Sequence, residues 1–322
     1  MTVIGLLCAL SRDDGRQTLR IGTMLGADGA RATLDDVIGV AKRVEAAGLD
    51  NVWLANIFSF DAITTLALIG RATERIGVGT AVTPTYPRHP TAIAQQAMTA
   101  QAACKGRFTL GIGLSHQVVI ETMLGLSYSR RAAHMREYLS VLMPLVRGET
   151  ARFSGEEYKV RGLTMEIPGS EGMDVVVAAL GPAMLKVAGE LADGTNTWMV
   201  GPRTMEDHVV KGLTAAAATA GRPAPKIVGG YPVVLTTKPD EARERIAGNL
   251  TIYGQLPSYR AMLDREGAEG PADIAIVGDE NRLRGEIKRL EDIGVTDFNA
   301  AIMNVEEGAY DRTLEFLSSL KG

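Results

Sequence analysis

Short apolar segments suited to β-strands alternate with segments of helical periodicity along almost the whole chain of 322 residues. Strands that are regularly separated by helices form parallel sheets, and eight such units are enough to close a barrel. The first helix shows the signals well, because Thr33 and the following acidic residues suit its start and Gly48 suits its end. The eight expected strands are residues 19–25, 51–55, 76–82, 108–112, 174–180, 195–200, 226–236 and 298–303.

Two stretches exceed this alternation and are predicted to be insertions. After the fourth strand, a long helix at about 130–147 is followed by residues 151–167, which suit a small hairpin. After the seventh strand, residues 240–290 suit two or three additional helices. No break in composition divides the rest, so the sequence predicts one α/β domain, a (β/α)8 TIM barrel, over residues 19–322. Residues 1–18 are expected to form an N-terminal extension, either an extra strand or a poorly ordered segment.

Composition excludes several classes of function. The net charge is −4 and the basic residues are scattered, which gives nucleic-acid binding no electrostatic support. No apolar run approaches the roughly 20 residues that a membrane-spanning helix needs, and the first residues lack the basic group of a signal peptide. Cys8 and Cys104 are too few for a disulfide framework or a metal motif. We therefore expect a cytoplasmic protein that acts on a small molecule without a metal.

The stretch from Arg75 to His116 is predicted to contribute most to a binding site. It suits a strand, a polar loop, a helix, a second strand and a second polar loop. The carboxyl ends of parallel strands meet at one edge, where ligands bind. Glycines at two successive strand ends would let a flat ligand approach the backbone, or would simply pack against neighbouring strands; they are Gly77, Gly79, Gly111 and Gly113.

Five stretches of the chain resemble one known group of proteins. They are LANIFSFDAIT, GTAVTPTYPRHP, GRFTLGIGLSHQVVIETMLGLSY, AAHMREYLSVL and AALGPAMLKVAGELADG. Across about residues 19–320 the chain resembles the bacterial luciferase-like monooxygenase and oxidoreductase superfamily. Within that superfamily it is most similar to the actinobacterial branch that uses the deazaflavin coenzyme F420. The resemblance implies an F420-dependent oxidoreductase, with FMN as the alternative cofactor, and pairing into homodimers through the second and third helices.

A phosphate site is predicted where the fifth and sixth strands end. Pro suits the first turn of a helix, and the free backbone N–H groups of such a turn attract anions without a basic side chain. A plain strand-to-helix turn is the alternative. The resemblance implies that these strand ends bind the phosphate of the flavin or deazaflavin through Leu180, Gly181, Pro182, Ala183, Met199, Val200 and Gly201.

The ring of the cofactor is expected at the ends of the first four strands. The resemblance implies a bulge after the third strand, with a non-proline cis peptide between Ala81 and Val82. It also implies hydrogen bonds from Thr80 and Thr83 to the pyrimidine edge of the ring. Further contacts are expected from Asn56, Gly113, Leu114 and Ser115. Related proteins often have Asp-His where this chain has Asn56-Ile57, and an amide cannot act as an acid or base near neutral pH.

His116 is the best candidate for proton transfer, because it follows a strand end and its ordinary pKa lies near 6.5. A purely structural histidine is the alternative. Tyr86 is the second candidate proton donor, or a group that orients the substrate. Other polar residues are expected to be structural: Arg88 and His89 as loop anchors, His134 and Arg136 as solvated or core-packed residues, and His208 and Asp193 without a site role.

The predicted reaction is hydride transfer between C5 of the deazaflavin and a small organic substrate, an enone, imine, carbonyl or alcohol. An FMN-dependent monooxygenase or reductase on the same barrel is one alternative. A cofactor-binding protein without turnover is the other, and the absent Asp-His pair is the sequence feature that favours it.

Overall fold

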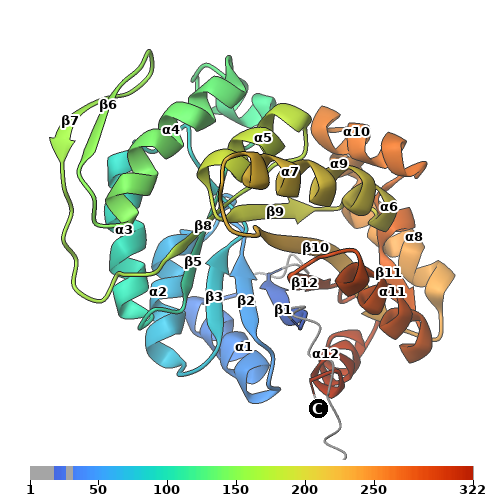
Figure 1. Ribbon diagram of the computed structural model, residues 1–322. Coiled ribbons are helices and arrows are strands. Elements are labelled where there is room, and N and C mark those ends of the chain that lie inside the picture. The colour runs from blue at the N-terminus through green and yellow to red at the C-terminus, as the bar shows by residue number, and fades with distance from the viewer. Residues whose placement is uncertain (1–17, 27–31, 322) are drawn as a thin grey trace, which may run out of the picture.

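The computed structural model describes residues 18–26 and 32–321. Eight parallel strands close into a barrel, as predicted (Figure 1). The circle runs through neighbouring strands and closes where the last pairs with the first: β1 (Arg20–Leu25), β2 (Asn51–Leu54), β3 (Gly77–Thr80), β5 (Phe108–Gly113), β8 (Asp174–Val177), β9 (Gly194–Trp198), β10 (Lys226–Leu235) and β12 (Asp297–Ile302). All eight lie within four residues of the predicted bounds at either end. Most of the predicted extension falls outside the described residues, as does Cys8.

Helices surround the barrel and cover its outer face (Figure 1). They are α1 (Leu34–Ala46), α2 (Ala62–Ala72), α3 (Pro90–Ala103), α4 (Arg131–Val146), α5 (Pro182–Leu191), α7 (Lys211–Thr219), α11 (Glu280–Asp292) and α12 (Ala309–Ser319). Their starts follow local chemistry. Thr33 and Asp36 form the reciprocal capping box that opens α1, and Asp61 caps α2 through the backbone N–H of Thr64.

The insertions lie where the sequence predicts them. After β5 come the π-helix η1 (Val118–Met123), α4 and an antiparallel hairpin. After β10 come three helices, one 3₁₀ turn and one short strand. The elements of these insertions, other than η1 and α4, are β6 (Ala151–Ser154), β7 (Lys159–Leu163), α8 (Pro239–Asn249), α9 (Thr251–Gln255), α10 (Pro257–Glu266), η3 (Pro271–Ile274) and β11 (Ile276–Gly278).

Several short elements lie outside the sequence prediction. Strand β11 pairs with the second half of β10 and is not part of the closed circle. The third predicted strand ends at Thr80, and pairing with β5 resumes at β4 (Thr83–Pro84). After β9, the short helix α6 (Pro202–Thr204) continues through the π-helix η2 (Met205–Val210) into α7.

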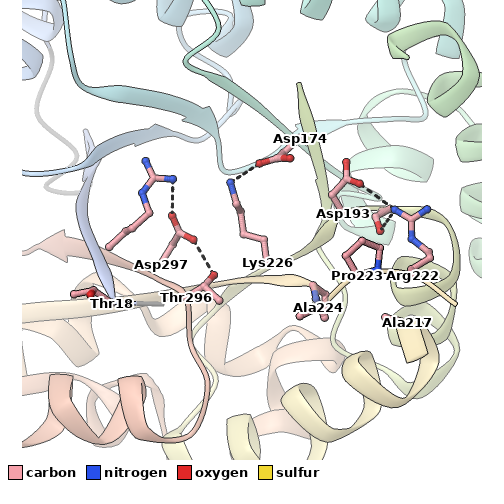
Figure 2. A pocket seen from close by; sticks show the side chains of 13 residues that line it. Thr18, Asp174, Asp193, Ala217, Arg222, Pro223, Ala224, Lys226, Thr296 and Asp297 are labelled. Carbon is pink, nitrogen blue, oxygen red and sulfur yellow. Dashed lines mark hydrogen bonds and ion pairs between the residues drawn. The ribbon is translucent and has the colours of Figure 1, made fainter. Parts of the chain in front are cut away.

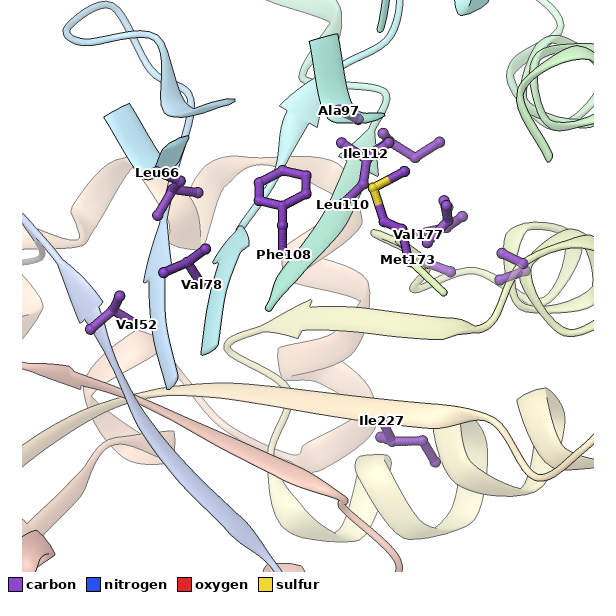
Figure 3. Packing of buried hydrophobic residues seen from close by; sticks show 14 of the residues in the cluster. Val52, Leu66, Val78, Ala97, Phe108, Leu110, Ile112, Met173, Val177 and Ile227 are labelled. Atoms are coloured by element: carbon purple, nitrogen blue, oxygen red, sulfur yellow. The ribbon is translucent and has the colours of Figure 1, made fainter. Parts of the chain in front are cut away.

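The main hydrophobic core lies between the outer face of the barrel and the helices. Figure 3 shows Val78, Phe108 and Leu110 on adjacent strands, with Leu66 of α2 and Ala97 of α3 in the same cluster. Full burial of one such large apolar side chain stabilises the fold by about 1.5–3 kcal/mol. A second cluster, which we call the insertion core, lies beneath α8–α10. It consists of Met199, Val234, Ala242, Ile246, Leu250, Leu263, Ile274, Ala275, Val277, Met303, Val305 and Ala309.

The glycines of β3 and β5 serve close packing inside the protein. A Cβ on Gly79 would lie 2.4 Å from the Trp53 ring, and one on Gly111 would lie 2.0 Å from the Thr80 carbonyl oxygen. A Cβ on Gly77 would meet the Asn51 side chain at 2.3 Å. The idea that these three glycines make room for a flat ligand is therefore wrong, because side chains and backbone of this chain fill that room. Their alternative role, packing between strands, is confirmed.

Candidate active site

The segment after β3 lies between the ends of β2 and β5. The peptide bond between Ala81 and Val82 is cis, as predicted. The Ala81 N–H donates to the Leu54 carbonyl at 2.8 Å, and the Thr85 N–H donates to the Gly113 carbonyl at 2.9 Å. A Cβ on Gly113 would lie 2.6 Å from a methyl group of Val82, so the Val82 side chain packs directly against the backbone of Gly113. The structure thus brings Ala81, Val82 and Gly113 together at the carboxyl end of the barrel.

The polar side chains of this segment differ in their availability. Thr80 is fully buried, and its hydroxyl donates to the Gly111 carbonyl at 2.6 Å and accepts from the Gly111 N–H at 2.8 Å. The predicted bond from Thr80 to the cofactor ring is therefore wrong, because Gly111 occupies the hydroxyl. The Thr83 hydroxyl is buried and has no partner among the described residues, so its predicted bond to the ring stays a prediction.

Asn56 follows β2 and holds the start of α2. Its side-chain oxygen accepts from the Ala62 N–H at 3.0 Å, and its backbone N–H lies 3.4 Å from the Val82 carbonyl oxygen. The backbone N–H of Asn56 therefore joins the end of β2 to the Ala81–Val82 segment, while its side chain holds the start of α2. Because the contact with Ala62 uses only the side-chain oxygen, the NH₂ group of Asn56 is the donor that remains for the predicted bond to the cofactor ring.

His116 lies at the carboxyl end of β5, after Leu114 and Ser115. Its carbonyl accepts from the N–H groups of Val119 and Ile120, which starts η1. The imidazole is half-buried and has no hydrogen-bond partner within the described part of the chain. Its ring centroid lies 5.9 Å from that of Tyr259 in α10. Burial lowers the pKa of His116 below its ordinary value, which favours the neutral ring.

Tyr86, the second candidate donor, is more constrained. Its hydroxyl donates to the Ser129 carbonyl at 3.2 Å, and its ring stacks on His134 at 4.0 Å between centroids. Nearby Tyr128 donates to the Ser115 carbonyl at 2.8 Å. Burial raises the pKa of Tyr86, so the phenol stays protonated. Because the Tyr86 hydroxyl is already engaged and the His116 imidazole is not, the geometry favours His116 for proton transfer.

The start of α5 is open, at the place where the phosphate is expected. Within the described ranges, 18–26 and 32–321, Gly181 begins the helix without a side-chain cap, and a Cβ built on it would meet nothing within 4 Å. Pro182 and Ala183, in the first turn, are exposed. The carbonyl of Leu180 accepts from His208 Nε2 at 2.7 Å, a contact with the backbone of this strand end, and the expectation that His208 has no site role stays a prediction. No local sequence pattern connects His208 with a residue 28 positions away.

The end of β9, where the sequence predicts a second part of the phosphate site, is already occupied by a side chain of this chain. The Glu266 carboxylate accepts from the N–H groups of Arg203 at 3.1 Å and Thr204 at 2.7 Å, at the start of α6. A Cβ on Gly201 would lie 2.3 Å from that side chain, so this glycine makes room for Glu266. The predicted share of Gly201 in binding phosphate is therefore wrong, because a carboxylate of this chain already occupies the helix start.

Met199 and Val200 are fully buried. Met199 belongs to the insertion core and Val200 to the main core, so their side chains pack inside the protein. Only their backbone atoms remain as predicted contacts of a phosphate.

The other polar residues confirm their structural roles. Arg88 pairs with Asp61 at 3.0 Å and His89 caps α3, so both anchor the loop. His134 is buried between Thr85 Oγ1, at 3.0 Å from its Nε2, and Glu157, at 2.5 Å from its Nδ1.

A cavity lies at the opposite, amino end of the barrel. It has a volume of about 620 Å³, and Figure 2 shows its charged lining. Lys226 pairs with Asp174 at 2.6 Å, and Arg222 pairs with Asp193 at 3.0 Å. Because these charges neutralise one another and lie away from the strand ends that bind ligands, we assign this network to stability rather than to chemistry. Asp193 is thereby confirmed as structural.

Metal ligands and membrane-spanning helices are two further features that bear on function. No group of three or more His, Cys, Asp or Glu side chains in that part of the chain is arranged to hold a metal ion. None of its helices is both long and apolar enough to span a membrane. Cys104 is buried, and burial raises the pKa of its thiol to about 11, so the thiol is inert near neutral pH.

Comparison with known proteins decides the family. A family model described as luciferase-like monooxygenase matches residues 17–297. The chain belongs to this family. Its curated relatives include a 5,10-methylenetetrahydromethanopterin reductase of Methanolobus tindarius, which is 29% identical over 74% of this chain and 72% of its own. A putative coenzyme F420-dependent oxidoreductase of Mycobacterium tuberculosis is 27% identical over 86% of this chain and 93% of its own.

Solved structures confirm the luciferase-like barrel. A coenzyme F420-dependent tetrahydromethanopterin reductase from Methanopyrus kandleri has a TM-score of 0.74 at 20% identity, and covers 94% of this chain and 97% of its own. An F420-dependent secondary alcohol dehydrogenase, solved with an F420-acetone adduct, has a TM-score of 0.78 at 18% identity, and covers 94% and 98%. This luciferase-like protein is therefore an oxidoreductase of that class.

Proposed function

We propose that this luciferase-like protein is an F420-dependent oxidoreductase that transfers a hydride between the deazaflavin and a small organic substrate. The substrate would be an enone, imine, carbonyl or alcohol. The observation that carries the chemistry is the half-buried imidazole of His116 at the end of β5, which has no hydrogen-bond partner among the described residues. The observation that carries the choice of cofactor is that relatives such as the mycobacterial oxidoreductase described above are named for F420.

The residues present fit a deazaflavin. The open helix start at Gly181 would hold its phosphate, because unpaired N–H groups and the helix dipole favour an anion there. The Ala81–Val82 segment, Gly113 and Ser115 would lie along the ring. No basic side chain is needed for this arrangement, since the backbone supplies the donors.

When bound, F420 supplies or accepts a hydride at its C5 carbon and passes electrons in pairs. The protein aligns the substrate and moves the accompanying proton. Because burial favours the neutral imidazole, His116 can accept a proton from an alcohol that is being oxidised. In the reverse direction the imidazolium donates a proton to the reduced product. His116 has this role without a neighbouring carboxylate, since Asn56 stands where related proteins often carry an acid.

Titration of the purified protein with F420 and with FMN tests the proposal. We expect F420 to bind with a change in its fluorescence and FMN to bind far more weakly. Exchange of the C5 hydrogen in the presence of candidate enones or alcohols then shows whether turnover occurs. Tight FMN binding without F420 binding would contradict the proposal and favour a flavin monooxygenase. F420 binding without any hydride exchange would favour a non-catalytic carrier.

The predicted homodimer through α2 and α3, the small-molecule partner and the cytoplasmic location belong to the same proposal. Analytical ultracentrifugation of the purified chain tests the dimer, which a single species at the monomer mass would contradict.

A further inference from the structure

Four rings form a row across the carboxyl end of the barrel, from the end of β5 to the end of β9. His116 lies 5.9 Å from Tyr259, Tyr259 lies 5.4 Å from Tyr253, and Tyr253 lies 6.3 Å from Trp198, all between ring centroids. We call His116, Tyr259, Tyr253 and Trp198 the ring row. All four are half-buried, so each ring keeps some surface that another molecule can contact.

The two tyrosines come from the insertion after β10. Tyr253 lies in α9 and Tyr259 in α10, and both pack against the insertion core. Their interplanar angle is 78° and that between Trp198 and Tyr253 is 73°, which are the edge-to-face contacts that aromatic rings prefer. The insertion thus extends an aromatic wall from the candidate proton-transfer residue to the strand next to the phosphate site.

The segments that carry the ring row hold almost no charge. Residues 246–259 contain no Asp, Glu, Lys or Arg, and residues 108–120 contain none either. Val118 and Met123 on η1 and Ile252 on α9 are large apolar side chains with exposures of 52%, 58% and 63%. An anionic substrate at this wall would lose its hydration without gaining a cationic partner.

Arg260, which follows Tyr259 in the sequence, and Arg131, at the start of α4, are already engaged. Arg260 pairs with Asp264 at 2.8 Å and also donates to the carbonyls of Ala268 and Glu269. Arg131 lies over the ring of Tyr128 at 5.8 Å. Neither guanidinium is free to bind a phosphate or a carboxylate without giving up these contacts.

We propose that the ring row is the substrate wall and that it selects a neutral substrate with an aromatic ring conjugated to the reacting group. This inference rests on the proposed function. The substrate's ring packs against Tyr259 and Tyr253, which places the conjugated carbonyl next to His116. The phenol groups matter less than the rings, because neither hydroxyl has a hydrogen-bond partner in the structure's described part.

A matched series of three enones tests the selection. Benzylideneacetone is neutral and aromatic, mesityl oxide is neutral without the ring, and benzylideneacetone with a 4-carboxylate carries the ring and a charge. In turnover, benzylideneacetone accepts a hydride at its β-carbon and a proton at its α-carbon, which yields the saturated ketone as the reduced deazaflavin is oxidised. Equilibrium binding is measured by calorimetry on the full chain, both without cofactor and with oxidised F420, so that it does not depend on turnover.

We expect benzylideneacetone to bind about twofold to tenfold more tightly than mesityl oxide, the ratio that one aromatic contact supplies. The carboxylated compound should bind more weakly than both. Tyr259→Leu should abolish the preference for the ring, and Tyr259→Phe should keep it. Ser258→Ala, a change to an exposed residue next to Tyr259 on α10, is the matched control. Tyr253→Leu replaces Tyr259→Leu if circular dichroism shows that the latter is unfolded.

Equal binding of the two neutral enones, tighter binding of the carboxylated one, or an unchanged preference in Tyr259→Leu would overturn the substrate wall. Failure of F420 to bind would contradict the proposed function, whereas ligand selection by the cofactor-free chain would still report on the ring row. The two failures are therefore distinguishable.

Discussion

Replacing Glu266 by Ala tests whether a carboxylate of this chain fills the anion position after β9. In the structure, Glu266 accepts from the backbone N–H groups of Arg203 and Thr204, at 3.1 and 2.7 Å. Glu266→Ala removes both acceptors and leaves the first turn of α6 uncapped. The guanidinium of Arg203 keeps its bonds to the carbonyls of Arg265 and Glu266, so α10 should stay in place.

The size of the effect follows from these two bonds. A helix cap is worth about 0.5–2 kcal/mol, and a hydrogen bond to a charged group about 1.5–3 kcal/mol. Since the Arg203 N–H is exposed and regains water, we expect a total loss of about 1.5–3 kcal/mol. In a chain of 322 residues that corresponds to a fall in Tm of roughly 2–5 °C.

Thermal unfolding in phosphate and in a buffer without phosphate supplies the assay. With an uncapped helix start, phosphate should bind the variant and restore about 1.4 kcal/mol at ten times its Kd. Glu269→Ala is the matched control, because it removes the same charge nearby while the Glu269 contacts in the structure come from its backbone. Equal Tm values for the two variants, or equal gains in phosphate, would refute the assignment of Glu266 as the internal anion.

Three other predictions concern the site. Gly181→Asp should weaken F420 binding at least tenfold, because a carboxylate at the open start of α5 repels phosphate; unchanged affinity in a folded variant would place the phosphate elsewhere. His116→Ala should lower turnover by roughly 10²–10⁴-fold with little change in F420 affinity. Since burial lowers the pKa of His116, wild-type reduction should fall as pH rises through a value below 6.5, and a pH profile of the variant that keeps this limb would contradict its role. Thr80→Val should lower the free energy of unfolding by about 1–3 kcal/mol, because the N–H of Gly111 loses its buried acceptor. Urea titration measures this, and an unchanged unfolding midpoint would contradict the importance of that hydrogen bond.

The barrel itself was accessible from the sequence because each strand and each helix carries its own local signal. Alternation of apolar runs and helical stripes predicts eight strands, and the capping residue Thr33 predicts the start of α1. Strand β11 escaped prediction because three residues, Ile276–Gly278, are too few to show a period. The segment after β3 could be predicted only through its resemblance to a known family.

The candidate site was less accessible, because its contacts join residues that are far apart in the chain. Glu266 reaches Thr204 across 62 positions, and no local pattern marks it as a helix cap. Tyr259 meets His116 only because the insertion folds back over the end of β5. For Thr80 the sequence predicted a ligand contact that the structure does not leave open. A polar residue at a strand end suits such a contact, but the Thr80 hydroxyl is bonded to Gly111 of the neighbouring strand.

The insertion core joins the segment between β10 and β11 to the barrel, because Met199, Val234 and Met303 belong to the same hydrophobic cluster as Ile246 and Leu263 of the segment. That one continuous segment supplies both Tyr253 and Tyr259 of the ring row and the Glu266 carboxylate. Replacement of this segment as one block would therefore change the ring row and the Glu266 cap of α6 together, while the eight strands and the open start of α5 keep their own residues.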